Sequence, residues 1–494
     1  MRQNPKARHE YETMKTFLPL LTLAVASNIY AADAGPKLVP AGKPNVLLIV
    51  VDDLRPDFGC YGNPGVSSPN MDRLAAEGLL FQRAYCQFPL CMPSRASVLS
   101  GFRPESIKKT LRVTGRVPAK TITLPQLFRN NGYTTVSIGK VYHENDDDPA
   151  GWVRRYTNTF GEGNGYCSGY QLEEDRALVQ NYLHGKRPAS PIAEITDTPD
   201  EKFPDGIIAQ HAIEELRKFK QSGEPFFLAP GFYRPHMPET APKKYWDMYD
   251  VSKITLPADF HQPDDGIPRY DWDEVRRYGD CPRSGPMPEA KAREIIRGYH
   301  ASVTFVDTQV GKVLRELHRL GLDKNTIVLL WSDNGWNLGN HGRFSKETDY
   351  EPSAHITMML KVPWLPGKQV TTALVELVDI YPTLAELCRL SAPDYLEGTS
   401  VVPLLADPQR PWKSAAFSCL FGAKARTIRT DRYRLIEHPG GQLELYDHQN
   451  DPDEDNNLAA NPALGGTLKE LQAALQAGWR TARPKPEGLP NGTR

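Results

Sequence analysis

The stretch NVLLIVVDD, residues 45–53, decides the fold class of this chain. Residues 46–51 are all apolar, without the polar alternation of a half-exposed strand. A continuous apolar run of this length is typical of a strand buried on both faces of a parallel sheet. Two carboxylates, Asp52 and Asp53, follow where the strand ends. Because ligands of α/β sheets gather beyond the carboxyl ends of the strands, this stretch predicts a central strand and one wall of a functional site.

Three more apolar runs lie at residues 134–138, 226–229 and 327–331. The first leads to Lys140 and the last to Asp333 and Asn334. Helical patterns accompany these runs at residues 69–77, 93–99, 206–220 and 289–320. Strands that alternate with helices predict an α/β fold with a large, mainly parallel sheet flanked by helices. We therefore expect the polar residues that follow the strands to meet in one site.

The texture of the sequence changes beyond Pro411. Residues 427–437 and 442–447 predict the strands of a hairpin around residues 438–441, and residues 464–481 predict a terminal helix. We divide the chain into residues 1–32, an export signal with a preceding extension, residues 43–409, a main domain, and residues 410–494, a smaller α+β domain.

The net charge of the chain does not rule out a local binding pocket for an anion, but it argues against two classes of partner. Lys and Arg number 59 and Asp and Glu number 60, a formal net charge of −1, so nothing in the bulk electrostatics favours nucleic acid or an anionic membrane. The apolar run at residues 17–26, preceded by Lys15 and followed by small residues, predicts an export signal cleaved near Ala32; a disordered tail is the alternative. The run is too short to span a bilayer. We expect an exported protein, periplasmic or secreted, with no membrane span.

The chain has seven cysteines. Because this number is odd, at least one thiol stays unpaired even in an exported protein, where disulfides can form. Cys91 precedes the helix predicted from Pro93, and Arg95 lies in its first turn. Helix N-termini favour anions, although a single Cys in such a place is more often buried and inert. The remaining cysteines pair in several ways or stay free: Cys60, Cys86, Cys167, Cys281, Cys388 and Cys419.

The string CMPSRASVLSGFRP, residues 91–104, resembles the signature of the type I, formylglycine-dependent sulfatase family. The resemblance covers nearly the whole chain and is closest to the iduronate-2-sulfatase branch. Further matching elements lie at residues 51–62, 139–143, 234–238, 301–311, 332–342, 427–430 and 444–447. The resemblance implies the alkaline-phosphatase/sulfatase-like fold, with residues 43–409 as the catalytic domain.

Four oxygen-bearing side chains predict a metal site. Asp52, Asp53, Asp333 and the amide of Asn334 form a set suited to a hard cation such as Ca²⁺. The Asp-Asp pair alone fits a solvated loop or a helix cap equally well. The family often has His at position 334, and Asn there leaves calcium favoured over zinc. The resemblance adds residue 91 as a ligand.

The resemblance also implies a mechanism in which a formylglycine-generating enzyme converts Cys91 to formylglycine. One hydroxyl of the formylglycine hydrate attacks sulfur, and the other then loses its proton and expels sulfate. Arg95 is expected to hold the hydrate. Lys140 and Lys346 are expected to neutralise the charge that builds on the sulfate oxygens.

Two histidines compete for the role of general acid towards the leaving sugar oxygen. His236 is preferred and His143 is its competitor, although a His before Pro in a loop is more often structural. His341 is expected only to orient its loop. For Trp336 and residues 270–278 we expect core packing rather than stacking on sugars.

The branch resemblance implies that the substrate is a sulfated mono- or oligosaccharide carrying a 2-O-sulfate on a uronic acid. Ulvan and carrageenan remain alternative substrates, because residues 145–198 and 262–288, which are expected to select the sugar, follow the family least closely. A phosphoesterase of the same superfamily is less favoured, since those enzymes usually carry two zinc ions and a Ser or Thr nucleophile. A non-catalytic binder of sulfated glycans would have no use for the modification string.

Overall fold

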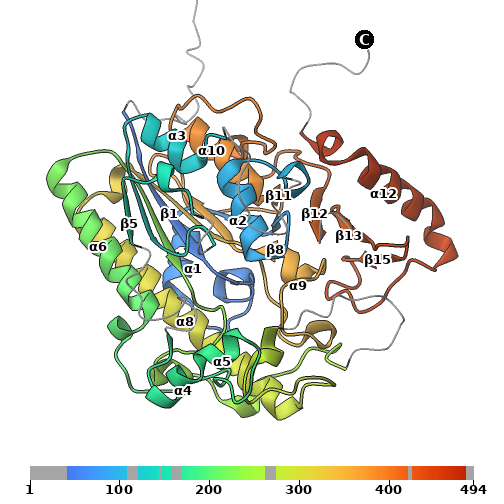
Figure 1. The fold of residues 1–494 in the computed structure, drawn as a ribbon. Helices are drawn as coiled ribbons and strands as arrows, with labels where there is room; N and C mark the ends of the chain where they lie inside the picture. Colours follow the sequence, from blue (N-terminus) through green and yellow to red (C-terminus); the bar gives the residue numbers. More distant parts are fainter. Residues whose placement is uncertain are drawn as a thin grey trace, which may run out of the picture. The chain divides into compact units, whose positions relative to one another are not determined.

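An eight-stranded mixed sheet lies at the centre of the computed structural model, which describes residues 42–107, 121–143, 147–156, 169–261, 274–420 and 425–484 (Figure 1). The strand order is β10-β2-β9-β7-β1-β6-β4-β5. All pairs are parallel except those that β9 makes with β2 and β7. The strands are β1 (Asn45–Val51), β2 (Leu79–Phe81), β4 (Thr134–Gly139), β5 (Arg154–Tyr156), β6 (Phe226–Phe232), β7 (Thr326–Ser332), β9 (Met358–Lys361) and β10 (Gln369–Thr371). The predicted fold class and its four buried strands are confirmed.

Strand β1 is buried along its whole length because helices cover both of its faces. Alternate side chains enter two separate cores. Leu47, Ile49 and Val51 pack with residues of α1 (Pro69–Glu77), α6 (Pro204–Ser222) and α8 (Glu289–Arg319). The side chains that point the other way pack with α2 (Cys91–Ser100), α3 (Leu124–Asn130) and α10 (Ile380–Leu387). Each aliphatic side chain buried in this way contributes ~1.5–3 kcal/mol, so β1 anchors both layers.

Smaller elements complete the structure around this sheet. A three-stranded sheet has the order β11-β3-β8. The elements are β3 (Ala84–Tyr85), β8 (His355–Ile356), β11 (Val375–Glu376), α4 (Glu173–Ala177), α5 (Val179–Leu183), α7 (Lys243–Trp246), α9 (Glu351–Ala354) and α11 (Val402–Ala406).

The C-terminal region is a four-stranded antiparallel sheet followed by α12 (Gly465–Ala477). The strands are β12 (Ala416–Leu420), β13 (Ala425–Arg429), β14 (Tyr433–Glu437) and β15 (Leu443–Asp447). The hairpin at residues 438–441 is confirmed: His438 N–H donates to the carbonyl of Gln442 at 2.8 Å. Residues 427–437, expected as one strand, are two, because Thr430 N–H closes a turn on the carbonyl of Tyr433. Strand β12 was not predicted. The boundary at residues 409 and 410 stays a prediction.

Three further expectations concern the export signal, the cysteines and a membrane span. The export signal lies outside them, as does Cys167. The six described cysteines are free thiols. The helices of the described ranges include none long and apolar enough to cross a bilayer.

Candidate active site

The polar residues that follow β1, β4 and β7 meet at one edge of the central sheet, as the sequence predicted. The register pairs Val51 with Ser332, so the two residues after each strand become neighbours. The backbone N–H of Asp53 donates to Oδ1 of Asp333 at 3.2 Å, and the amide of Asn334 donates to Oδ1 of Asp53 at 2.7 Å. Lys140, after β4, places Nζ 2.5 Å from Oδ2 of Asp52.

Cys91 is the first residue of α2 and faces both carboxylates that follow β1. Its Sγ lies 3.3 Å from Oδ1 of Asp52 and 3.6 Å from Oδ1 of Asp53. The helix begins at Cys91 and not at Pro93 as expected, because a proline lacking an N–H fits in the first turn of a helix. Leu90 precedes the helix in an extended conformation and provides no side-chain cap. Burial raises the pKa of the Cys91 thiol well above its usual value, and the Asp333 and Asp52 charges add to this effect.

Arg95, one turn into α2, ties the strand ends together. Its Nε lies 2.7 Å from Oδ2 of Asp333, and Nη2 lies 2.9 Å from Oδ1 of Asp52. Its Nη1 donates to the carbonyls of Lys140 and Val141. The side chain is fully buried, so these charge-assisted contacts are not weakened by water. Arg95 therefore fixes the positions of two carboxylates and of the backbone that carries Lys140.

Lys346 approaches the site from the loop beyond β7. Its Nζ lies 2.9 Å from Oδ1 and 2.7 Å from Oδ2 of Asp53. It also lies 5.2 Å from the centre of the Trp336 ring, a cation–π distance. Burial opposes the charge of Lys346, but Asp53 and its neighbours raise the pKa of the ammonium group well above its usual value. The contact with Asp53 therefore favours the charged form of Lys346.

His236 presents one ring nitrogen to the cluster. Nδ1 lies 2.6 Å from the carbonyl of Met237, which only accepts hydrogen bonds, so Nδ1 carries a proton. Nε2 lies 3.6 Å from Oδ2 of Asp53. Burial lowers the pKa of His236 well below its usual value, and Lys346 lowers it further. The lowered pKa favours the neutral ring, and Nε2 is the nitrogen that faces the cluster.

The three carboxylates of the site have different acidities. Burial alone would raise the pKa of Asp52, but Lys140 and Arg95 hold that pKa well below its usual range. Burial raises the pKa of Asp53 to about 7; Lys346 opposes this rise, and the charges of Asp52 and Asp333 add to it. Burial also raises the pKa of Asp333. Buried like charges repel each other, and a divalent cation between them would relieve that repulsion.

Carboxylate, thiol and imidazole atoms of the site lie close enough together to hold a metal ion. One ligand atom from each of Asp52, Asp53, Cys91 and His236 lies within 4.8 Å of the others. Oδ1 of Asn334 is buried and has no hydrogen-bond partner among the described residues, which suits a metal-facing oxygen. Asp333 is less open, because its oxygens accept from Arg95 and from the backbone of Asp53 and Asn334. The nearness of His236 was not predicted.

Two of the histidines that the sequence singled out, His143 and His341, lie in different surroundings. His143 is half-buried, and it interacts electrostatically with the charged residues of the site. Burial lowers its pKa to about 3, and the positive charge of Lys140 contributes to this shift. His341 stacks on Tyr350 at 3.8 Å and places Nδ1 3.1 Å from Asp259, so it orients its loop as expected.

Trp336 and Tyr278 are buried in the core, as expected. Tyr278 packs on Tyr182 with ring centres 4.6 Å apart. The expected aromatic positions at residues 270–273 lie outside the described ranges.

The structure adds residues that the sequence did not single out. Glu274 lies 3.8 Å from Nε2 of His236 and 3.9 Å from Nζ of Lys346. Tyr299 of α8 hydrogen-bonds to the backbone of the loop that carries Asp53. Nothing in the local pattern marks Glu274. Tyr299 stands two residues before the matched string at residues 301–311, and that proximity is the only signal in the sequence.

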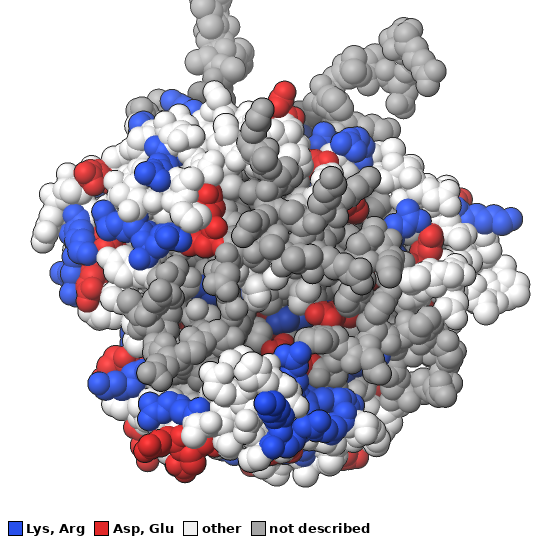
Figure 2. Space-filling view, viewed as in Figure 1, with Lys and Arg blue, Asp and Glu red and all other residues white. Residues whose placement is uncertain are grey.

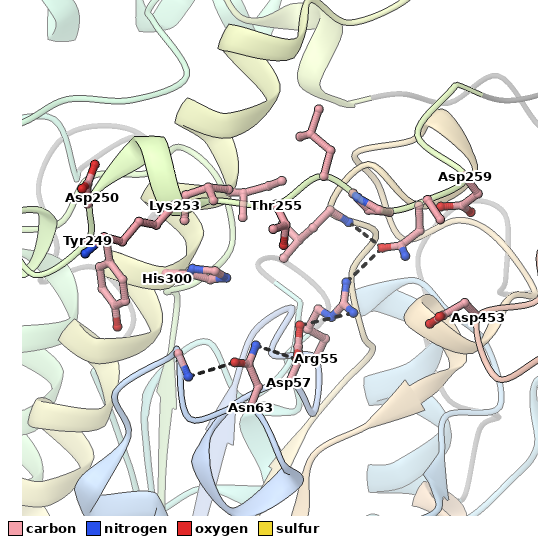
Figure 3. Close-up of a pocket in the computed structure, with 18 of the residues that line it drawn as sticks. Arg55, Asp57, Asn63, Tyr249, Asp250, Lys253, Thr255, Asp259, His300 and Asp453 are labelled. Atoms are coloured by element: carbon pink, nitrogen blue, oxygen red, sulfur yellow. Dashed lines mark hydrogen bonds and ion pairs between the residues drawn. The ribbon is translucent and has the colours of Figure 1, made fainter.

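A pocket of about 490 Å³ lies beside this loop and is lined by other residues (Figure 3). Arg55 forms part of its wall and donates to Oδ1 of Asn340 at 3.0 Å and to the carbonyl of Trp336. Asp57 and His300 face the same pocket. The face of the molecule drawn in Figure 2 mixes both signs of charge. The residues that line this pocket do not include Cys91 or the carboxylates beside it.

Comparison with known proteins agrees with the motifs. The family described as Sulfatase matches residues 44–390, and one described as N-sulphoglucosamine sulphohydrolase, C-terminal, matches residues 339–480. Iduronate 2-sulfatase of Mus musculus is 37% identical over 398 residues, which cover 71% of this chain and 69% of the relative. A sulfatase of Formosa agariphila is 33% identical over 454 residues, 88% of this chain and 86% of the relative.

Two solved structures share the fold. One, in complex with D-glucosamine-2-N,6-O-disulfate, has a TM-score of 0.70 at 22% identity and covers 88% of this chain and 97% of that chain. The other, phosphonate monoester hydrolase of Agrobacterium radiobacter, has a TM-score of 0.70 at 22% identity, with 88% and 96% covered. Because one is named for a phosphonate ester and the other was solved with a sulfated sugar, the fold alone does not choose the reaction.

Proposed function

This chain belongs to the sulfatase family, and from that premise we propose that it removes a 2-O-sulfate from a uronic acid, with formylglycine at position 91. Hydrolysis of sulfate esters of sulfated saccharides follows from the family and from the identity to iduronate 2-sulfatase. The sugar, the sulfate position and the modification are the proposed part. The observation that carries the proposal is Cys91, which opens a buried helix within 3.6 Å of two carboxylates and begins the complete modification string.

We expect one Ca²⁺, held by Asp52, Asp53, Asp333 and Asn334 together with residue 91. The oxygen donors and the buried, unpartnered Oδ1 of Asn334 support a hard cation. When bound, the ion polarises a sulfate oxygen and makes sulfur a better electrophile.

The side chains of the site divide the remaining work. Lys140 and Lys346 are the two buried ammonium groups at the carboxylates, and they stabilise negative charge on the sulfate oxygens. Arg95 holds the formylglycine hydrate and fixes the carboxylates of Asp52 and Asp333, which it binds. His236 gives a proton to the departing sugar oxygen from Nε2, the ring nitrogen that faces the cluster. His143 remains the competing acid.

Maturation requires a partner. A formylglycine-generating enzyme reads the Cys-x-Pro-x-Arg string at residues 91–95, and the chain is exported to the periplasm or secreted. Mass spectrometry of the peptide that contains residue 91, after co-expression with such an enzyme, should show an aldehyde in place of the thiol. An active protein with a fully unmodified peptide would overturn this part of the proposal.

Substrate identity is tested by release of sulfate from a panel of disaccharides. We expect the 2-O-sulfated uronic acid to be hydrolysed faster than disaccharides that carry only 6-O- or N-sulfate. Faster release from ulvan or carrageenan oligosaccharides would replace the uronate proposal and leave the sulfatase activity intact. Phosphate and phosphonate monoesters belong in the same panel, with measurement of bound metal. Two zinc ions and preferred phosphoester cleavage would support the phosphoesterase alternative.

A further inference from the structure

Tyr299 of the long helix α8 contacts the backbone on both sides of Leu54. Its hydroxyl donates to the carbonyl of Asp53 at 2.7 Å and accepts from the backbone N–H of Arg55 at 2.9 Å. The side chain is 2% exposed, so water does not replace these contacts. One phenolic oxygen therefore satisfies a buried carbonyl and a neighbouring N–H that the turn leaves without a partner in the sheet.

Asp53 adopts a left-handed backbone conformation, which is uncommon outside glycine although aspartate takes it more often than most residues. Its φ is 56°, in the left-handed region that favours glycine. Such a conformation persists only where its surroundings hold it. Asp333 binds the N–H of Asp53 at 3.2 Å, and Tyr299 binds its carbonyl. The residue is thus clamped from two directions, from the end of β7 and from α8.

The conformation of Asp53 matters because its carboxylate is shared by several groups. It lies 2.7 Å from Nζ of Lys346, 2.7 Å from the amide of Asn334 and 3.6 Å from Sγ of Cys91. A turn that relaxed towards ordinary φ values would swing this carboxylate away from all three partners. The hydroxyl of Tyr299 is a contact from outside the cluster that opposes this relaxation at Asp53 itself, while Thr357 binds the next carbonyl, that of Leu54, at 3.2 Å.

We propose that Tyr299 is a positioning residue of the metal site, whose hydroxyl holds Asp53 in its left-handed turn and so keeps the carboxylate aimed at the cation and at residue 91. This inference rests on the proposed calcium site. A purely space-filling role is the alternative, and the two differ in one atom, because phenylalanine fills the same volume without the hydroxyl.

The test is the variant Tyr299→Phe. Loss of a contact behind a metal ligand typically weakens metal binding about 10–100-fold, so the calcium Kd, measured by titration calorimetry or chelator competition, should rise by that factor. Activity should fall at limiting calcium and recover towards the wild-type kcat at saturating calcium. Hydrogen–deuterium exchange of the peptide that spans residues 53–56 should also accelerate, which needs no metal and no substrate.

A matched control lies against the same helix. The hydroxyl of Tyr249 accepts from the backbone N–H of Ser67 at 3.0 Å and lies 2.5 Å from Oγ1 of Thr304, away from the metal ligands. Tyr249→Phe removes a similar pair of hydrogen bonds and should leave the calcium Kd unchanged. If both variants lower stability alike and neither changes the calcium Kd, the positioning role is wrong while the proposed function stands. If the wild-type protein binds no calcium, the metal part of the proposed function fails, and this inference fails with it.

Discussion

The ammonium group of Lys346 lies 2.7 Å from Oδ2 of Asp53, and both side chains are buried. The two residues are 293 positions apart in the sequence. Because a buried cation next to a carboxylate keeps its charge, Lys346 is ready to meet a sulfate group without prior ionisation. This pair and the equivalent contact of Lys140 with Asp52 place two buried ammonium groups at the site that we propose binds the sulfate group.

Removing either lysine should slow every substrate. The charge on the sulfate oxygens grows in the transition state whatever the leaving group, so Lys346→Ala or Lys140→Ala should lower kcat by about 100-fold or more. The loss should be similar for a sugar sulfate and an activated aryl sulfate in steady-state assays. Lys220→Ala is the control. Lys220 lies in the last turn of α6, just before β6 begins, and so near the amino ends of the strands, away from the site at their carboxyl ends. A loss confined to one substrate class would contradict this role.

His236 should matter only when the leaving group is poor. A sugar alkoxide needs a proton as it departs, whereas a nitrophenolate hardly does. His236→Ala should therefore cripple hydrolysis of a sugar sulfate while largely sparing an aryl sulfate of low leaving-group pKa. The same comparison with His143→Ala tests the competitor. Equal losses on both substrates for His236→Ala would show that it is a sulfate or structural contact.

Cys91 variants should separate the two hydroxyl groups of the formylglycine hydrate. Cys91→Ala should abolish turnover, and Cys91→Ser should nearly do so, because serine provides one hydroxyl and cannot expel sulfate by the second step. Both assays use protein co-expressed with a formylglycine-generating enzyme, and the wild-type sample prepared in parallel is the reference. Sustained multiple turnover by Cys91→Ser would refute the formylglycine mechanism.

Asp333 should contribute to stability as well as to the metal. Its carboxylate binds the buried guanidinium of Arg95 at 2.7 Å, and removing one partner of a buried pair costs about 3 kcal/mol. Asp333→Ala should therefore lower the free energy of unfolding in urea even without calcium, in addition to abolishing activity. The exposed Asp394→Ala, measured alongside, should change neither. The contact with Arg95 is the reason to expect this loss of stability.

Acid stability should depend on Asp200. Burial would raise its pKa, but hydrogen bonds from Lys244, Lys312 and Gln309 lower that pKa to about 2. A folded-state pKa below the usual 3.8 means that Asp200 stabilises the protein above about pH 4 and that this contribution disappears between pH 4 and pH 2. Asp200→Asn should lower the Tm at pH 7 and flatten its decline over that acid range. Asp394→Asn again serves as control, and an unchanged acid profile for Asp200→Asn would contradict the assignment.

The sequence by itself determined the elements whose residues are decided locally. The uninterrupted apolar residues within 45–53 indicate by themselves a strand that is buried on both faces. The ends of β1, α1, α6 and α8 were predicted to within two residues. The modification string also stands in one piece, so Cys91 and Arg95 were recognisable without any structure. The missed strand β12 and the split of residues 427–437 show where short strands carry too little pattern.

The sequence predicted that the residues after these strands meet, but only the tertiary structure decided which of their atoms touch. Strand order is a property of the whole sheet: β7 lies beside β1, and the pairing of Val51 with Ser332 is what brings Asp53 to Asp333 across 280 residues. No local pattern encodes that neighbourhood, because it depends on long-range pairing and on which helices cover each face. The hydroxyl of Tyr299 beneath the turn of Asp53, and the approach of His236 to the carboxylates, exist only once the sheet and α8 have packed together.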